Sequence, residues 1–201
     1  MSVDLRLQYV QHRELQRAIK ETGAEAGSAV TIDAWTGEIL AISNYPVFNP
    51  NSRAIFDYDN ARNRALTDVF EPGSTIKTFT LVAGLESGQF LTDSIIDTSP
   101  GLIRIGTKVL NDPRDYGKLT VSEIIQKSSQ VGVTKMATAI GHGPILKVLA
   151  RFGFGEQTGT GFPGERTGSI PSHERASAID KVSVAFGYGL SSTLTQLARA
   201  Y

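Results

Sequence analysis

A chain-breaking dipeptide followed by a long apolar run constrains the fold more than any other feature of this 201-residue sequence. Pro72-Gly73 ends any regular element before it, and residues 74–86 are mostly apolar up to a second break at Gly88. A helix that is apolar on most sides has to be buried. The sequence therefore predicts a core helix that begins at Ser74.

Composition excludes several classes of protein. The formal net charge is zero, so the basic surface of a nucleic-acid or anionic-membrane binder is not expected. The chain has no cysteine, which rules out disulfides, thiolate metal sites and a cysteine nucleophile. It contains no apolar run of about 18 residues, so we expect no membrane segment, and its length predicts one domain over 1–201 without a second.

Local patterns predict short elements along the whole chain. A helix is expected over 4–21, capped by Asp4 and ended by Gly23, followed by a hairpin of residues 29–33 and 38–42 around Gly37. Loops with short strands are expected over 91–118. Further helices are expected over 121–127 behind a Thr120 cap, 131–140, 144–152 and from Thr193 to the end, with an irregular Gly/Pro-rich stretch over 153–171.

The segment Glu71-Pro-Gly-Ser-Thr-Ile-Lys77 is the first candidate for chemistry. In a helix that starts at Ser74, the Ser74 hydroxyl and the Lys77 amine lie three residues apart on one face. A desolvated lysine can take the proton of a serine and make it a nucleophile. Random placement gives about 0.7 such pairs in a chain of this composition, so the spacing alone is weak evidence and the context carries the prediction.

A second candidate is Ser128-Ser129-Gln130, a polar triplet between two helical runs. Such a triplet is most often only a helix junction with a serine cap. The functional interpretation is a hydroxyl presented into a cleft, where it passes protons between Lys77 and a leaving group.

Taken together, these residues resemble the transpeptidase domain of class B penicillin-binding proteins, of the division-specific type. Beside the Ser74 segment, six ordered blocks carry the resemblance: Asp33 to Ala41, Phe48 to Asn51, Asn63 to Asp68, Lys127 to Val133, Gly161 to Glu165, and Ala185 to Leu190. The resemblance implies an α+β fold, a partial penicillin-binding or serine β-lactamase-like transpeptidase fold with a helical subdomain and the first hairpin of an antiparallel sheet.

The resemblance also implies roles for individual residues. Ser74 would attack a peptidoglycan stem peptide at its penultimate D-alanine, and the acyl group would pass to a neighbouring strand as a cross-link. Lys77 would be the base and Ser128 the proton relay, while Gln130, Glu71 and Gly73 would bind or shape the approach of substrate. No cofactor and no metal are implied. The expected partners are stem peptides, β-lactams and cell-division proteins, on the periplasmic side of the bacterial inner membrane.

Three features depart from the family pattern, the smallest being Leu194 where the family usually has Pro. Position 130 is Gln where the second motif ends in Asn, which would shift the amide by about 1 Å. No lysine begins the third motif, Lys-Thr/Ser-Gly, so the sequence is interpreted as a fragment that lacks the later strands. A non-catalytic binding or scaffold remnant is therefore the alternative, and a β-lactamase is a weaker one.

Several other signals are set aside. The letters of a dinucleotide fingerprint occur over 159–164, but Pro163 lies inside them and no helix start follows. The histidines His12, His142 and His173 are scattered and are expected to be surface or capping residues. The acidic pairs Asp57/Asp59 and Asp112/Asp115 are expected to be solvated or turn-forming, and Trp35 is expected to pack.

Overall fold

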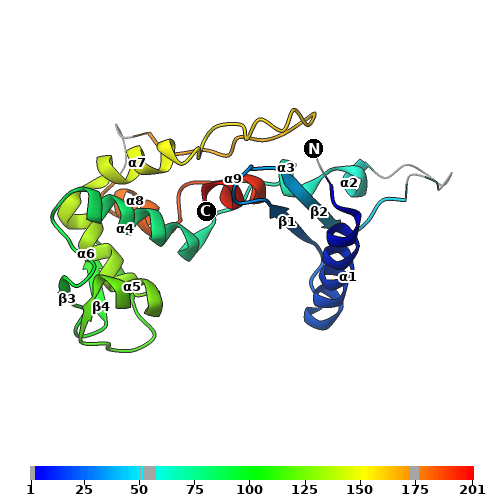
Figure 1. The fold of residues 1–201 in the computed structure, drawn as a ribbon. Coiled ribbons are helices and arrows are strands. Elements are labelled where there is room, and N and C mark those ends of the chain that lie inside the picture. The colour runs from blue at the N-terminus through cyan, green and yellow to red at the C-terminus, as the bar shows by residue number, and fades with distance from the viewer. Residues whose placement is uncertain (1–2, 50, 52–57, 173–176) are drawn as a thin grey trace. The chain divides into compact units, whose positions relative to one another are not determined.

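The computed structural model describes residues 3–49, 51, 58–172 and 177–201, and the chain divides into two units. The first unit comprises 1–70, 156–168 and 192–201, and the second comprises 71–155 and 169–191 (Figure 1). The expectation of one domain over 1–201 stays a prediction.

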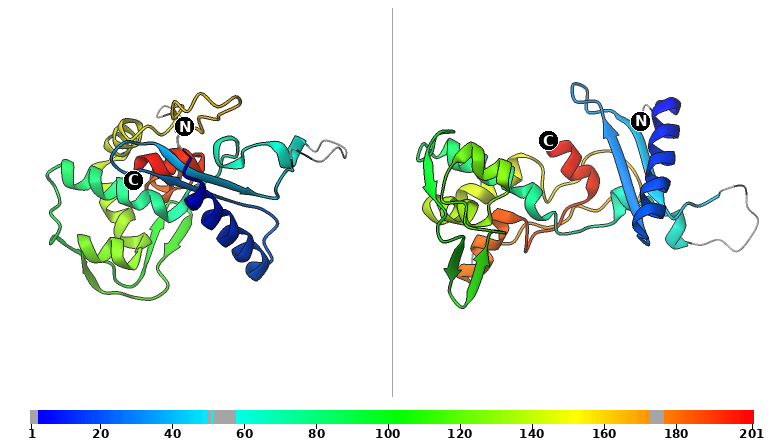
Figure 2. Two further views of the ribbon diagram at one scale, coloured as in Figure 1. Left: turned by 45° about the vertical axis from the view of Figure 1, so that its right-hand side comes forward. Right: turned by 90° about the horizontal axis from the view of Figure 1, so that it is seen from below.

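The first unit is a two-stranded antiparallel hairpin with helices on both sides. Its elements are α1 (Leu5–Thr22), β1 (Gly27–Ile32), β2 (Ile39–Tyr45), α2 (Tyr58–Ala61), α3 (Arg64–Thr67) and α9 (Leu194–Ala200). Helix α1 lies on one side of the hairpin and α9 on the other (Figure 2). The predicted caps of α1 are confirmed, because Asp4 accepts the amides of Arg6 and Leu7 and Gly23 ends the helix in the left-handed conformation.

Side chains along β2 alternate between buried and half-buried positions, with the two-residue period of a strand. Ile39, Ala41 and Ser43 are buried. The buried Ser43 hydroxyl accepts hydrogen bonds from the side-chain amides of Gln8 and Gln11 on α1. The hairpin prediction is confirmed, but Trp35 in its loop is 98% exposed, so the expectation that Trp35 packs is wrong.

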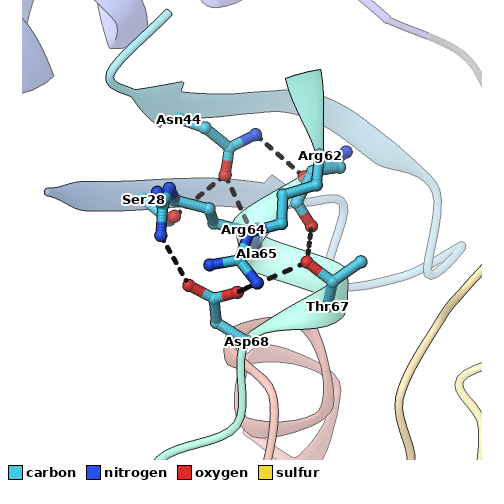
Figure 3. A network of polar contacts seen from close by, with 8 residues as sticks. Ser28, Asn44, Arg62, Arg64, Ala65, Thr67 and Asp68 are labelled. Carbon is cyan, nitrogen blue, oxygen red and sulfur yellow. Dashed lines mark hydrogen bonds and ion pairs between the residues drawn. The ribbon is translucent and has the colours of Figure 1, made fainter. Parts of the chain in front are cut away.

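A polar network ties α3 to the hairpin of the same unit (Figure 3). The Asn44 side-chain oxygen on β2 accepts from the Ser28 hydroxyl and from the Ala65 amide, both at 2.9 Å. Because the Ala65 amide lies in the first turn of α3, Asn44 supplies the cap that the helix's own residues do not. At the other end of α3, Asp68 pairs with both Arg62 (3.3 Å) and Arg64 (3.1 Å).

Glu165 closes the Gly/Pro-rich loop of the first unit on itself. Its buried carboxylate accepts from the Thr158 amide (2.6 Å), the Thr158 hydroxyl and the Thr160 hydroxyl (2.8 Å). Burial acts to raise the pKa of Glu165, but these hydrogen bonds outweigh it and the pKa is lowered. No helix follows the fingerprint-like letters within 159–172, as the sequence predicts.

The lowered pKa predicts an acid-sensitive contribution to stability. The pKa of Glu165 in the folded chain lies below its unfolded value of 4.5, so the ionised carboxylate stabilises the folded state at pH values above 4.5. This contribution to the free energy of unfolding is lost as the pH falls through the folded-state pKa. We expect Glu165→Gln to reduce the free energy of unfolding by about 1–3 kcal/mol near neutral pH. In urea titrations this difference should shrink below about pH 4.5. Glu156→Gln, at an exposed position of the same loop, is the matched control, and equal stability of the two variants at neutral pH would contradict the prediction.

The second unit is a helical core with two small antiparallel strand pairs. Its helices are η1 (a 3₁₀ helix, Gly73–Ile76), α4 (Lys77–Glu86), α5 (Val121–Lys127), α6 (Gln130–Ile140), α7 (His142–Arg151), α8 (Ala178–Ser183) and η3 (a 3₁₀ helix, Val184–Phe186). Strand β3 (Ile95–Asp97) pairs with β6 (Lys118–Thr120), and β4 (Leu102–Ile105) pairs with β5 (Lys108–Asn111).

Helix α4 is the centre of this unit, as its apolar run predicts. It packs against α6 and α7 (Figure 1). Phe79 is 2% exposed and meets the rings of Phe152 and Phe154 edge-on, with ring centroids 5.1 Å apart in both pairs. Gly84 allows the close approach of α6, since a Cβ there would lie 2.6 Å from the Met136 methyl.

Two expectations about this unit need correction. The sequence pattern did not reveal α8 and η3, which are too short for a clear period, although Ser177 and Asp180 form a capping box at the start of α8. His142 is buried and not a surface residue; its Nδ1 lies 2.8 Å from the Lys181 carbonyl. His173 of this unit lies outside the described residues, as do Asp57 and Pro50 of the first unit.

Candidate active site

Ser74 and Lys77 lie at the two ends of one 3₁₀ turn. Ser74 is the second residue of η1 and Lys77 the first of α4, and the Lys77 amide donates to the Ser74 carbonyl. Side chains three residues apart eclipse one another in a 3₁₀ helix, so both project from the same side. The predicted helix is present, but it begins one residue earlier than expected, at Gly73, and its first turn is 3₁₀ and not α. Ser74 is exposed, whereas Lys77 is only 4% exposed.

The Lys77 amine reaches the second serine motif. Its Nζ donates to the Ser128 carbonyl oxygen at 2.5 Å and to the Ser128 hydroxyl at 3.0 Å. Burial lowers the pKa of Lys77, while the negative charge of Asp112 acts to raise it. The ion pairs of the described residues do not include Lys77. A buried amine with a lowered pKa, outside any salt bridge, meets the requirements for a proton acceptor.

Ser128 takes an unusual backbone conformation to make both contacts. It ends α5 with φ 52°, and among the described residues it is the one non-glycine with positive φ. The left-handed conformation costs a non-glycine residue about 1–2 kcal/mol. In this conformation the carbonyl and the hydroxyl of Ser128 both accept hydrogen bonds from the Lys77 amine.

The rest of the triplet begins α6. Ser129 is fully buried and caps the helix by accepting the Gly132 amide at 2.9 Å. Gln130 is the first helical residue, one position earlier than predicted, and is half-buried. The amides of Gln130 and Val131 both donate to Asp112, at 2.5 and 3.1 Å.

Asp112 is the residue of this site that the sequence reasoning missed. The sequence predicts that Asp112 and Asp115 form a solvated or turn-forming pair, and this is correct for the exposed Asp115 but wrong for Asp112, which is 5% exposed. No local signal separates the two positions, because the partners of Asp112 lie 17 to 19 residues further along the chain.

Glu71 and Gly73 bind the segment of Ala185 to Leu190, the last of the resembling blocks. A Glu71 carboxylate oxygen accepts the Gly189 amide at 2.8 Å, and the Gly73 amide donates to the Gly187 carbonyl at 3.2 Å. Thr80 on α4 donates to the Ala185 carbonyl at 2.8 Å. The turn that carries Ser74 is thus fixed from both its ends. The predicted contacts of Glu71, Gly73 and Gln130 with substrate stay predictions.

The described residues contain no group of three or more His, Asp or Glu side chains able to hold a metal ion. Within the same part of the chain, no helix is long and apolar enough to cross a membrane.

An exposed serine, a buried lysine one 3₁₀ turn later and a serine turn from a neighbouring helix define a serine–lysine site on an α+β fold. The chain belongs to the penicillin-binding protein transpeptidase domain family, whose model matches residues 27–201. The family and the fold predicted from the sequence are thereby confirmed.

Named relatives match over the whole chain. It is 43% identical over 201 residues to PbpC of Pseudomonas aeruginosa, described as a probable peptidoglycan D,D-transpeptidase, and 42% identical to the peptidoglycan D,D-transpeptidase FtsI of Escherichia coli K12. The match covers all of this chain but 36% and 34% of those proteins, so the chain spans about a third of their length. The apo structure of the TP domain of penicillin-binding protein 3 from Burkholderia pseudomallei superposes with a TM-score of 0.89 at 35% identity, over 100% of this chain and 56% of that one.

Proposed function

We propose that this chain carries the acylating serine of a peptidoglycan D,D-transpeptidase, which cross-links stem peptides during bacterial cell-wall synthesis. The observation that carries the proposal is the buried Lys77 amine, held by Ser128 one 3₁₀ turn from the exposed Ser74. The names of the relatives agree with this reaction. A place in the division complex on the periplasmic side of the inner membrane belongs to the same proposal.

In the proposed reaction, neutral Lys77 takes the proton of the Ser74 hydroxyl as Ser74 Oγ bonds to the carbonyl carbon of the penultimate D-alanine. The Ser74 amide, in the first turn of η1, lacks an intrahelical acceptor and is suited to stabilise the negative oxygen that forms. The carbon–nitrogen bond then breaks, and the proton passes from Lys77 through the Ser128 hydroxyl to the amine of the departing D-alanine.

An amine of a second stem peptide attacks the ester in the next step, which forms the cross-link and returns the proton to Ser74. β-Lactams acylate the same hydroxyl by opening their ring, so no group leaves and the protein keeps the added mass. Gln130, Glu71 and Gly73 are proposed to shape the approach of substrate to Ser74.

Covalent labelling by a fluorescent penicillin tests the nucleophile. We expect the 201-residue chain to gain the mass of one penicillin, and Ser74→Ala to abolish that gain, because alanine has no oxygen to acylate. Ser122→Ala, the same change at an exposed serine of α5, should keep the label. Intact-mass spectrometry over a time course gives the rate.

Two outcomes would overturn the proposal. Label that persists in Ser74→Ala would remove Ser74 as the nucleophile. A folded parent chain that never gains the mass would favour the alternative, a non-catalytic module that binds or scaffolds. Release of hydrolysed penicillin with repeated turnover would instead indicate a β-lactamase.

A further inference from the structure

Asp112 places a buried carboxylate directly behind the Ser128–Gln130 turn. Its Oδ2 accepts from the Ser129 hydroxyl at 2.6 Å, and its Oδ1 accepts from the amides of Gln130 (2.5 Å) and Val131 (3.1 Å). A buried charge is tolerated when hydrogen-bond donors surround it, and bonds to a charged acceptor are the strong ones. Three donors from three consecutive residues therefore converge on one side chain.

The backbone of Asp112 is itself held in place. Asp112 follows directly on β5, and its amide donates to the Gly101 carbonyl at 2.9 Å. Gly101 in turn lies so close to the same loop that a Cβ on it would be 2.9 Å from the Asp115 Cα. The loop that carries Asp112 is thus held against Gly101 at both Asp112 and Asp115, so the carboxylate has a fixed position from which to bind the Ser128–Gln130 turn.

The Asp112 carboxylate binds the turn whose residue Ser128 contacts Lys77. Ser128 bears a left-handed backbone, and the Asp112 bonds begin at the very next residue. We propose that Asp112 is a positioning residue of the serine–lysine site, whose carboxylate holds the Ser128–Gln130 turn so that the Ser128 carbonyl and hydroxyl both face the Lys77 amine. This inference rests on the proposed function for its consequence in catalysis.

Asp112 also acts on the amine through its charge. It opposes the effect of burial and keeps the pKa of Lys77 higher than burial alone would. The other charged or titratable residues on α4 and on the helices packed against it are Glu86, Glu123, Lys127, Lys135, His142, Lys147 and Arg151. Several of these have their own partners: Arg151 pairs with Glu86, Glu123 binds Thr120, and Lys135 binds the Asp97 carbonyl. Within the described part of the chain, Asp112 is the charged residue that shifts the pKa of Lys77.

Two substitutions separate the charge from the hydrogen bonds. Asp112→Asn keeps an oxygen for the amides of Gln130 and Val131 but removes the negative charge, whereas Asp112→Ala removes both. Asp115→Asn is the matched control, because Asp115 is exposed, lies in the same loop and accepts the Gly117 amide through an oxygen that asparagine retains.

The first measurement is the pKa of Lys77 itself, from NMR titration of chains carrying ¹³C at lysine Cε, with the signal assigned by its loss in Lys77→Arg. We expect Asp112→Asn to lower the pKa of Lys77, because a favourable negative charge is gone, and Asp115→Asn to leave it unchanged. The second is hydrogen exchange at the amides of Gln130 and Val131, which we expect to speed up about tenfold or more in Asp112→Ala, since each amide loses its hydrogen bond to a buried charge.

The rate of acylation by penicillin then tests whether the position of the Ser128–Gln130 turn affects the reaction at Ser74. We expect Asp112→Ala to slow acylation at every pH, and Asp112→Asn to shift the rising limb of its pH profile to lower pH. An unchanged pKa of Lys77 in Asp112→Asn together with unchanged exchange in Asp112→Ala would overturn the inference. Because neither measurement needs an active chain, failure of the proposed function would appear separately, as absence of Ser74-dependent labelling in the parent.

Discussion

Replacing Lys77 with arginine is expected to slow acylation of Ser74 by penicillin about 10²–10⁴-fold, the usual contribution of a positioned general base. Arginine keeps the positive charge but cannot give up its proton in a protein, so it cannot accept one from Ser74. The same change at Lys147, an exposed lysine of α7, should leave the rate unchanged.

Burial of position 77 makes a second variant necessary. Lys77 is 4% exposed, and the larger guanidinium of arginine, which stays charged, is costly to bury there. Lys77→Met has a similar length, carries no charge and suits a buried site. If Lys77→Met melts at the parent's temperature and still acylates at the parent's rate, Lys77 is not the base.

The pH dependence follows from the same residue. The neutral amine is the active form, so the acylation rate should rise with pH through the pKa of Lys77 and level off above it. Burial lowers that pKa below the ordinary 10.5, which moves the rise towards neutral pH. The slow reaction of Lys77→Met should lack this rise. A rate that falls with increasing pH in the parent would contradict the assignment of a lysine base.

The features predicted correctly from sequence are those determined by neighbouring residues. Thr120 and Thr193 each start a helix with a side-chain cap and a capping partner three residues later, so both helix starts could be read directly. The apolar run after Pro72-Gly73 predicted the buried α4 for a similar reason. Ser74 and Lys77 share one turn, and their relation is local as well.

What the sequence could not supply depends on contacts between distant residues. Asp112 and Asp115 are alike in sequence, and only the approach of α6 distinguishes the buried carboxylate from the exposed one. The left-handed Ser128 could not be inferred either, because serine does not favour that conformation by itself. The contact between Lys77 and Ser128, 51 residues apart, was expected from the family resemblance and not from spacing.

Gly187 is a further position whose importance only the fold reveals, and Gly187→Ala is expected to have the second large effect. Gly187 has φ 88°, and a Cβ on it would lie 2.0 Å from the Gly73 carbonyl oxygen and 2.5 Å from the Gly73 nitrogen. Both are backbone atoms, so no side chain can swing aside to relieve the overlap. The turn that carries Ser74 or the end of η3 must move instead.

Gly189→Ala separates this overlap from backbone strain. Gly189 also has positive φ (74°), yet a Cβ there would meet no atom within 4 Å, and alanine keeps the amide that binds Glu71. Both variants should lose about 1–2 kcal/mol of unfolding free energy from the left-handed conformation. Gly187→Ala should lose about 1–3 kcal/mol more from the overlap, as seen in urea unfolding or as a smaller yield of folded chain.

In Gly187→Ala the acylation rate should fall by more than the loss of folded protein explains, because the displaced backbone of Gly73 adjoins the nucleophile Ser74. A shift of about 1 Å in a reacting group can cost about 100-fold in rate, so folded Gly187→Ala should label at least that much more slowly than folded Gly189→Ala. Equal labelling of the two folded variants would show that Gly187 serves packing alone. Slower labelling of Gly187→Ala, at equal amounts of folded protein, would instead show that the close approach of the Gly73 and Gly187 backbones sets the position of the Ser74 hydroxyl relative to Lys77.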